Sequence, residues 1–288
     1  MFNPDQEETM SKVWFITGAG RGIGAEIARS ALEAGHRVVA TGRKPSDLEA
    51  TFKVHGGNVL CLPLDVAREP QSASAVARAV DRFGRIDVLV NNAGYGQLGL
   101  FEEVPGTAVE EQFQTNVFGL MHVTRAALPQ MRRQRSGHIF NLASIGGFMG
   151  FESSSIYCAT KFAVEGFSES LALEVARFGI HVTVVEPGFF RTDFLDATSV
   201  RYGDKRIVDY DDPHGAPRTG YEAYNHRQPG DPARLGRALV QIAELAKPPL
   251  RFTAGSDAVA YAREAYVRRQ AEIAEHAALS VSTDFAVG

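Results

Sequence analysis

Tyr157 and Lys161 lie four residues apart in the run SIYCATKFAV (155–164), whose pattern is helical. Residues at this spacing share one face of a helix, where a weak surface contact is one interpretation. The other interpretation is proton transfer, because a free phenol has a pKa of about 10 and a nearby ammonium group lowers it. The pair alone leaves both interpretations open.

A glycine-rich segment near the N-terminus could hold a phosphate. The sequence TGAGRGIGAEIARSALEAG places Gly18, Gly20, Gly22 and Gly24 between an apolar run and a helical pattern. Glycines allow a tight turn and a close approach of the backbone to a ligand, and a helix N-terminus attracts anions. Ile23 occupies the last glycine position of the usual G-x-G-x-x-G pattern, so the match is to T-G-x-x-x-G-x-G. A tight turn without a ligand is the alternative, and the position after a first strand favours a dinucleotide.

The next apolar run indicates which dinucleotide. It ends VVATGRK, with Arg43 at the position where an NAD site usually carries an acidic residue, and Asp47 is the first acid that follows. Arg21 adds a second guanidinium from the glycine turn. Two guanidinium groups suit a 2′-phosphate, although both could be solvated surface residues. We therefore expect NADP(H) in preference to NAD(H).

Short apolar runs alternate with longer helical patterns along most of the chain. Runs of this kind, rich in β-branched residues, are typical of strands buried on both faces. They are 12–17, 37–41, 58–64, 86–91, 138–143, 181–186 and 250–255, and the helical stretches between them are 22–34, 45–55, 69–83, 107–134 and 153–178. The alternation predicts an α/β fold: a single Rossmann-type, doubly wound parallel sheet of about seven strands with helices on both faces.

The remaining segments suggest how the chain is divided. Residues 1–10 are polar and acidic and are expected to be a flexible leader, so that 11–288 would form a single domain. Residues 193–230 show little periodicity, and we expect them to form a substrate loop or lid. A helix begins at Asp231–Pro232, a good N-cap followed by a proline suited to the first helical position. Residues 256–288 are expected to form a C-terminal helical extension.

Composition narrows the classes of function. The 288 residues are 44% hydrophobic and 22% charged with a net charge of −4, which is ordinary for a globular protein and gives no basic stripe for nucleic acid. No signal-peptide pattern or membrane span is evident, so we expect a cytoplasmic protein. Cys61 and Cys158 do not make a disulfide framework, and no cluster has metal-ligand spacing.

Six motifs occur in the order and spacing of one known family. They are TGAGRGIG (17–24), NNAG (91–94), the asparagine of FQTNVFG, NLAS ending at Ser144, YCATK (157–161) and PGFFRT (187–192). Over roughly residues 11–192 the chain resembles the classical short-chain dehydrogenases/reductases. Its longer tail resembles the subgroup related to 17β-hydroxysteroid and retinol dehydrogenases, and it lacks the glycine-rich ending that helps build the family's tetramer.

The resemblance implies roles for individual residues. Tyr157 would be the general acid–base, Lys161 would lower its pKa and hold the nicotinamide ribose, Ser144 would hydrogen-bond the substrate oxygen, and Asn116 would hold a water that relays protons to the lysine. The cofactor contacts would be Gly18, Gly20, Arg21, Gly22, Ile23, Gly24, Arg43, Asp65, Val66, Asn92, Ala93, Gly94, Tyr157, Lys161, Pro187, Gly188, Phe190 and Thr192.

The expected function is an NADP(H)-dependent oxidoreductase that transfers hydride between the nicotinamide and a carbonyl or secondary alcohol substrate. The alternative is a catalytically idle, NADP(H)-sensing regulatory protein on the same fold. Phe148, Met149 and Phe151 could line the substrate pocket or simply pack. We expect a homodimer through the helices at 107–134 and 153–178, with a tetramer in doubt. Val259, Tyr261, Ala262, Tyr266 and Ile273 offer an apolar stripe on the last helix.

Overall fold

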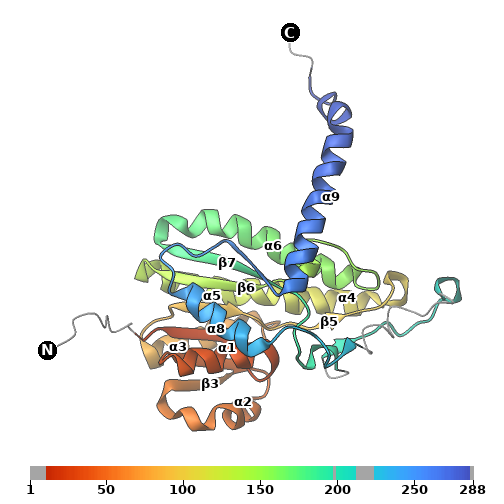
Figure 1. Ribbon diagram of the computed structural model, residues 1–288. Helices are drawn as coiled ribbons and strands as arrows, with labels where there is room; N and C mark the ends of the chain where they lie inside the picture. The colour runs from red at the N-terminus through yellow and green to blue at the C-terminus, as the bar shows by residue number, and fades with distance from the viewer. Residues whose placement is uncertain (1–10, 197–198, 212–223, 286–288) are drawn as a thin grey trace.

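The computed structural model describes residues 11–196, 199–211 and 224–285, and its centre is one parallel sheet with helices on both faces (Figure 1). The leader expected at 1–10 lies outside the described residues. The strands are β1 Val13–Thr17, β2 Arg37–Gly42, β3 Val59–Pro63, β4 Val88–Asn91, β5 Gly96–Gln97, β6 Gly137–Leu142, β7 Ile180–Pro187, β8 Val200–Arg201 and β9 Arg251–Ala254. The α-helices are α1 Gly22–Glu33, α2 Pro45–Phe52, α3 Glu69–Phe83, α4 Gly106–Phe113, α5 Gly119–Gln134, α6 Ser155–Val175, α8 Pro232–Ala243 and α9 Ser256–Val281.

The seven-stranded sheet has the order β3-β2-β1-β4-β6-β7-β9, and every pairing in it is parallel. The order reverses between β1 and β4, so the carboxyl ends of these two strands border a crevice at the switch point. This is the doubly wound Rossmann sheet that the alternation of apolar runs predicts. The seven predicted strands correspond to the seven strands of this sheet.

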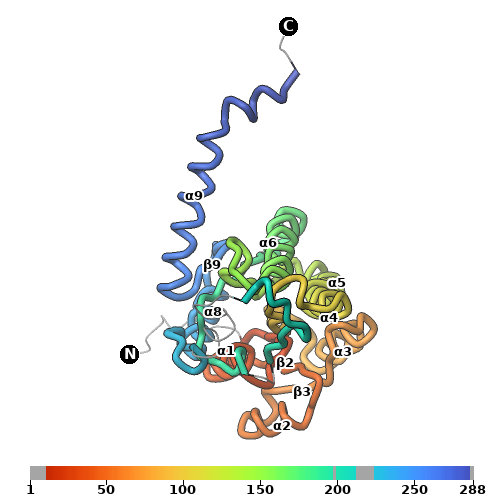
Figure 2. Tube along the Cα trace, turned by 90° about the vertical axis from the view of Figure 1, so that its right-hand side faces the viewer, coloured from red at the N-terminus to blue at the C-terminus, as the bar shows by residue number. Residues whose placement is uncertain are grey.

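The two faces of the sheet bury separate hydrophobic cores because successive side chains of a strand point to opposite sides. On β1, Val13 and Phe15 pack toward α3, α5 and α6, whereas Trp14 and Ile16 pack toward α1, α2 and α8. All four side chains are fully buried. Figure 2 shows the helices in these two groups on either side of the strands. The continuous apolar runs in the sequence reflect this burial on both faces.

Two features differ from the sequence prediction. The single helix predicted at 107–134 is interrupted by a π-helical turn, Gln114–Phe118, which separates α4 from α5. A separate parallel pair, β5 with β8, was not predicted; it joins the segment after NNAG to the segment 193–230. Neither feature could be predicted from periodicity. The π-helical turn comes from one extra residue in the helix, and the β5–β8 pair has only two residues in each strand.

None of the helices in the described ranges combines the length and the apolarity needed to cross a bilayer.

Candidate active site

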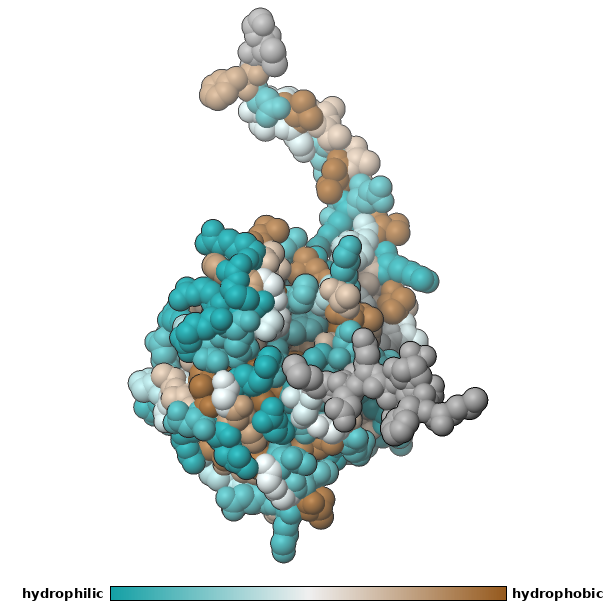
Figure 3. Space-filling view, turned by 90° about the vertical axis from the view of Figure 1, so that its left-hand side faces the viewer, coloured by the Kyte–Doolittle hydropathy of each residue, from teal (hydrophilic) through white to brown (hydrophobic). Residues whose placement is uncertain are grey.

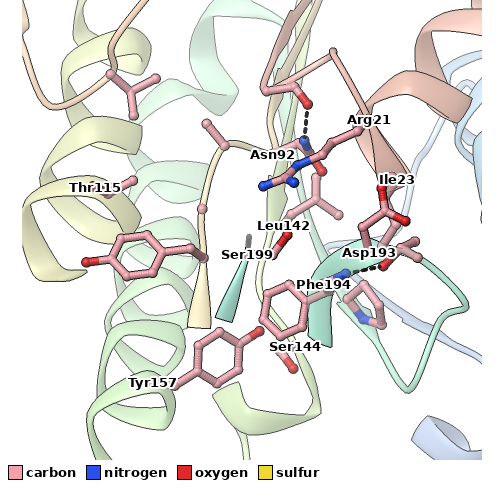
Figure 4. A pocket seen from close by; sticks show the side chains of 18 of the residues that line it. Arg21, Ile23, Asn92, Thr115, Leu142, Ser144, Tyr157, Asp193, Phe194 and Ser199 are labelled. Carbon is pink, nitrogen blue, oxygen red and sulfur yellow. Dashed lines mark hydrogen bonds between the residues drawn. The ribbon is translucent and has the colours of Figure 1, made fainter. Parts of the chain in front are cut away.

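A cavity of ≈ 1410 Å³ opens at the carboxyl ends of the parallel strands. The glycine turn, the end of β2, the NNAG segment, Ser144, the start of α6 and the PGFF segment all line it. Figure 4 shows part of this lining, with Arg21, Asn92 and Tyr157 among the labelled residues. Every site residue predicted from the sequence contributes to this lining except Gly24 and Asn116. The fold therefore brings segments from Gly18 to Gln228 to one cavity, which is what parallel strands with crossover helices achieve.

Tyr157 and Lys161 are placed by the first two turns of α6, which begins at Ser155. The Lys161 ammonium lies 5.6 Å from the centre of the Tyr157 ring and donates a hydrogen bond to the Leu142 carbonyl at 2.7 Å. Lys161 is only 8% exposed. Burial lowers its pKa to about 8, and the carboxylate of Glu165 opposes that shift. Lys161 is thus buried and Tyr157 is half-buried at the cavity, which is not the arrangement of a solvent-exposed surface pair.

Ser144 follows β6 and begins the short 3₁₀ turn Ile145–Gly147. Its hydroxyl accepts a hydrogen bond from the Gly146 N–H at 3.2 Å, which fixes the side chain at the start of the turn. Figure 4 shows the Tyr157 and Ser144 side chains next to each other at the floor of the cavity. Two hydroxyls on neighbouring side chains can both bind a single substrate oxygen.

Asn116 lies in the π-helical turn and is buried behind the cavity wall. Its amide accepts from the Tyr95 N–H at 3.1 Å and donates to the Tyr95 carbonyl at 3.0 Å. The same amide donates to the Thr160 hydroxyl at 3.3 Å. Asn116 therefore ties the segment after NNAG to the helix that carries Tyr157 and Lys161. The extra residue of a π turn is a common way to re-aim a functional side chain.

The glycine turn is held tightly against the NNAG segment. Gly18 has φ +64°, and a side chain there would lie 3.0 Å from the Ala93 Cα. A Cβ at Gly24 would come within 2.4 Å of the Asn92 amide nitrogen, so Gly24 permits packing and does not line the cavity. Asn92 donates to the carbonyls of Thr17 and Gly18 at 2.9 and 3.1 Å.

Thr17 is a structural residue that the sequence reading did not single out. Its hydroxyl accepts from the N–H groups of Asn92 and Ala93 at 2.9 and 3.0 Å, which joins the end of β1 to the end of β4. Thr17 is the first residue of the TGAGRGIG motif, so the motif already indicated this position.

The adenine end expected for a dinucleotide is rich in cations. Arg21, Arg43 and Lys44 all line the cavity, with Asp47 and Asp65 beside them. Arg21 is the N-cap residue of α1, and its side chain does not accept a capping hydrogen bond from the first N–H groups of the helix, which begin at the cavity. A glycine cradle, a helix N-terminus and guanidinium groups in one cavity fit a dinucleotide phosphate.

The PGFF segment is fixed from the opposite side by α9. The Phe189 N–H donates to the Asp257 carboxylate at 2.7 Å, and a Cβ at Gly188 would lie 2.3 Å from that carboxylate. Thr192 caps the next short turn by accepting from the Phe194 N–H at 3.2 Å. The last helix thus contributes to the shape of the cavity wall although it lies outside the motifs.

The apolar lining next to the Ser144 and Tyr157 hydroxyls differs in part from the prediction. Phe151 lines the cavity, whereas Phe148 and Met149 pack against α9 and do not. Phe194, which the sequence gave no reason to select, lies with its ring centre 5.7 Å from that of Tyr157. Phe151 and Phe194 therefore both contribute aromatic rings to the lining of the cavity.

A buried group of carboxylates lies behind Lys161 and was also missed. Glu165, one turn after Lys161, and Glu186 at the end of β7 both face Arg251, at 3.5 and 3.8 Å. Burial, with the charge of Glu186, raises the pKa of Glu165 to about 8. Burial also raises the pKa of Glu186. The sequence offered no signal for this group because its members come from three separate elements.

No group of three or more His, Cys, Asp or Glu side chains that could hold a metal ion occurs in the part of the chain that the structure describes.

Comparison with known proteins identifies the family. The family model described as short chain dehydrogenase matches residues 12–202. The chain belongs to the short-chain dehydrogenase family. It is 39% identical over 244 residues to a 3-ketodihydrosphingosine reductase of Bacteroides thetaiotaomicron. The aligned region covers 85% of this chain and 88% of the relative.

Solved structures of short-chain dehydrogenases agree with this assignment. A short-chain dehydrogenase from Streptomyces avermitilis superposes with a TM-score of 0.86 at 38% identity, over 96% of this chain and all (100%) of that one. The closed form of a serine dehydrogenase complexed with NADP⁺ superposes with a TM-score of 0.73 at 27% identity, over 83% of this chain and 93% of that one. The chain is accordingly an oxidoreductase on a Rossmann fold.

Proposed function

We propose that this short-chain dehydrogenase is an NADP(H)-dependent reductase of ketones or aldehydes, with Tyr157 as the general acid–base. The observation that carries the proposal is that Tyr157, Lys161 and Ser144 line the same cavity as the glycine turn. A reduced nicotinamide, when bound there, supplies the hydride. The ketone-reductase relative and the NADP⁺-bound neighbour support the substrate class and the cofactor.

The protein residues have separate tasks in this reaction. Ser144 donates a hydrogen bond to the carbonyl oxygen and stabilises the charge that develops on it. Tyr157 donates its proton to the same oxygen. Lys161, 5.6 Å from the ring centre, stabilises the phenolate left behind. Phe151 and Phe194, which line the cavity, would give the reacting carbon apolar surroundings.

The preference for NADP(H) rests on Arg21, Arg43 and Lys44, which line the cavity where the 2′-phosphate would be bound. Neither Arg43 nor Lys44 forms an ion pair with another described residue that would neutralise its charge. Two uncompensated cations favour a phosphate over a hydroxyl.

The test is to follow NADPH absorbance with a panel of ketones and aldehydes that includes 3-ketodihydrosphingosine. We expect turnover in the wild type and a loss of about 100-fold or more in kcat for Tyr157→Phe, because general acid catalysis contributes roughly that much. Tyr261→Phe, a tyrosine that packs on Phe151 outside the cavity lining, is the matched control and should keep its activity.

Tight NADPH binding without turnover of any substrate would favour the sensor alternative. Turnover that survives in Tyr157→Phe would contradict the role given to that residue.

A further inference from the structure

The start of α9 is the part of that helix that packs on the body. Its buried side chains are Ala258, Ala262 and Ala265. Of the apolar stripe predicted on this helix, Tyr261 and Ala262 pack against the body, and the other three members are exposed. Figure 3 shows the rest of the helix projecting beyond the body. Asp257, in the first turn, therefore lies in the anchored part, where it contacts the segment that follows β7.

The backbone of Gly188 and Phe189 is held by three hydrogen bonds. The Gly188 N–H donates to the Ala254 carbonyl at 2.9 Å, and the Phe189 carbonyl accepts from the Gly230 N–H at 3.0 Å. The Phe189 N–H donates to the Asp257 carboxylate at 2.7 Å. Only the last of these bonds is made by a side chain, so it is the one that a substitution can remove without changing the backbone.

The Gly188 carbonyl is the remaining polar backbone group of these two residues, and none of the residues that the structure describes donates a hydrogen bond to it. The peptide bond to Phe189 is trans, so its C=O and N–H groups point in opposite directions. The carbonyl therefore points away from Asp257. Gly188 lines the cavity, whereas Asp257 does not. The carbonyl is thus an acceptor that a ligand in the cavity can use.

The contact is closer than the start of a helix requires by itself. The other carboxylate oxygen of Asp257 accepts from the Ala258 N–H at 2.9 Å, and an acidic residue in the first turn stabilises a helix. A Cβ at Gly188 would lie 2.3 Å from the same carboxylate, and a Cβ at Gly255 would lie 2.6 Å from it. The carboxylate therefore fits a space that two glycines leave open. Because the acceptor is charged, its bond with the Phe189 N–H is stronger than one between neutral groups.

We propose that Asp257 is a positioning residue for the reaction: it holds the Phe189 N–H and thereby presents the Gly188 carbonyl to the carboxamide N–H of a bound nicotinamide. The inference rests on the proposed function, because it requires a nicotinamide in the cavity. The carboxamide is the N–H donor at the reactive end of the cofactor, and Gly188 lines the same cavity as Tyr157. Asp257 itself lies outside the lining, so it acts through the Gly188–Phe189 peptide.

The experiment compares the binding of two ligands to the wild type and to Asp257→Ala by isothermal titration calorimetry. One ligand is NADPH, and the other is 2′-phospho-ADP-ribose, the same dinucleotide without its nicotinamide. We expect the Kd of NADPH to rise about tenfold, because a hydrogen bond at the nicotinamide is lost. The Kd of 2′-phospho-ADP-ribose should stay at its wild-type value. NADH and ADP-ribose, titrated in parallel, give the same comparison for a chain that prefers NAD(H).

Asp87→Ala is the matched control. The Asp87 carboxylate also accepts a backbone N–H, from Val13 at 2.8 Å, but Asp87 precedes β4 and lies outside the cavity lining. This variant should lose thermal stability, as Asp257→Ala does, and should keep the wild-type Kd for both ligands.

Two further substitutions separate the hydrogen bond from the stability of α9. Asp257→Asn keeps a side-chain oxygen for the Phe189 N–H, and we expect it to bind NADPH within about threefold of the wild type. Asp257→Ser, whose hydroxyl is too short to replace the carboxylate, should behave like Asp257→Ala and takes its place if that variant does not fold.

The inference is overturned if Asp257→Ala binds NADPH like the wild type, or if it loses affinity for NADPH and 2′-phospho-ADP-ribose alike. Asp257→Asn binding as weakly as Asp257→Ala would also contradict it, because the acceptor oxygen would then not be what matters. These outcomes leave the proposed function standing, whereas a wild-type chain that binds neither NADPH nor NADH overturns both.

Discussion

The two sides of the cavity are built in different ways. The side proposed to bind the cofactor consists of strand ends, glycines and hydrogen bonds between side chains and backbone: Asn92 and Thr17 join β4 to β1, and Gly24 lets α1 lie against that join. The side proposed to bind the substrate consists of side chains from distant segments, with Phe194 next to Tyr157. The first kind of wall follows from the topology of the sheet, whereas the second depends on which side chains happen to meet. We therefore expect mutations on the two sides to affect different measurable quantities.

The largest effect is expected from Gly24→Ala on the cofactor side. The new Cβ would lie 2.4 Å from the Asn92 amide and 2.5 Å from the Gly18 carbonyl, so α1 or the glycine turn must move. We expect NADPH affinity to fall about 100-fold, or roughly 2.7 kcal/mol, measured by fluorescence titration or calorimetry. Gly166→Ala on α6, where nothing lies within 4 Å of the new Cβ, should leave that affinity unchanged.

Phe194→Ala is the corresponding change on the substrate side. Removing the ring that lies 5.7 Å from that of Tyr157 opens the pocket, and we expect kcat/KM for the carbonyl substrate to fall about 30-fold while the Kd of NADPH stays the same. Phe101→Ala, an exposed phenylalanine outside the cavity, controls for the loss of a ring. An equal loss of NADPH affinity would mean that the two sides are not separable.

Arg43→Asp tests the cofactor preference by reversing the charge at the end of β2. We expect the Kd of NADPH to rise about tenfold and that of NADH to change much less, because only NADPH carries the 2′-phosphate. Lys53→Asp, an exposed change of the same charge outside the cavity, is the control. Equal losses for both cofactors would argue against the NADP(H) preference.

The smallest effect is expected from Glu165→Gln, for which the measured quantity is thermal stability as a function of pH. The pKa of Glu165 is raised from 4.5 to about 8 by burial, so between pH 4.5 and 8 the folded state keeps a proton that the unfolded state has lost. This contribution to stability is present at low pH and is lost as the pH rises toward 8. A glutamine has no proton to lose. We expect the Tm of the variant relative to wild type to be a few °C higher at pH 8 than at pH 5.

Thermal unfolding at both pH values measures this difference. Glu169→Gln is the matched control, since Glu169 contacts the same Arg251 guanidinium at 2.9 Å but is half-exposed. Parallel Tm-against-pH curves for wild type and Glu165→Gln would show that the Glu165 carboxyl is not the group that titrates.

The sequence predicts the features that depend on neighbouring residues and misses those that depend on partners elsewhere in the chain. The seven strands, the glycine turn and the placement of Ser144, Tyr157 and Lys161 follow from patterns of neighbouring residues, because local periodicity and motif spacing record which backbone segments form strands and helices. The break at Gln114–Phe118 and the short β5–β8 pair were missed because each depends on a few residues whose partners lie elsewhere in the chain.

The sequence by itself determined the sheet, the order of its motifs, the tyrosine–lysine pair and the cations at the end of β2. Only the tertiary structure decided that Lys161 is buried with a carbonyl partner, that Phe194 and not Phe148 adjoins Tyr157, and that three acidic side chains gather around Arg251. The tertiary structure also decided which face of α9 packs against the body of the molecule and which face is exposed. The physical reason is that backbone periodicity is local, whereas burial and charge pairing arise only when distant segments pack together.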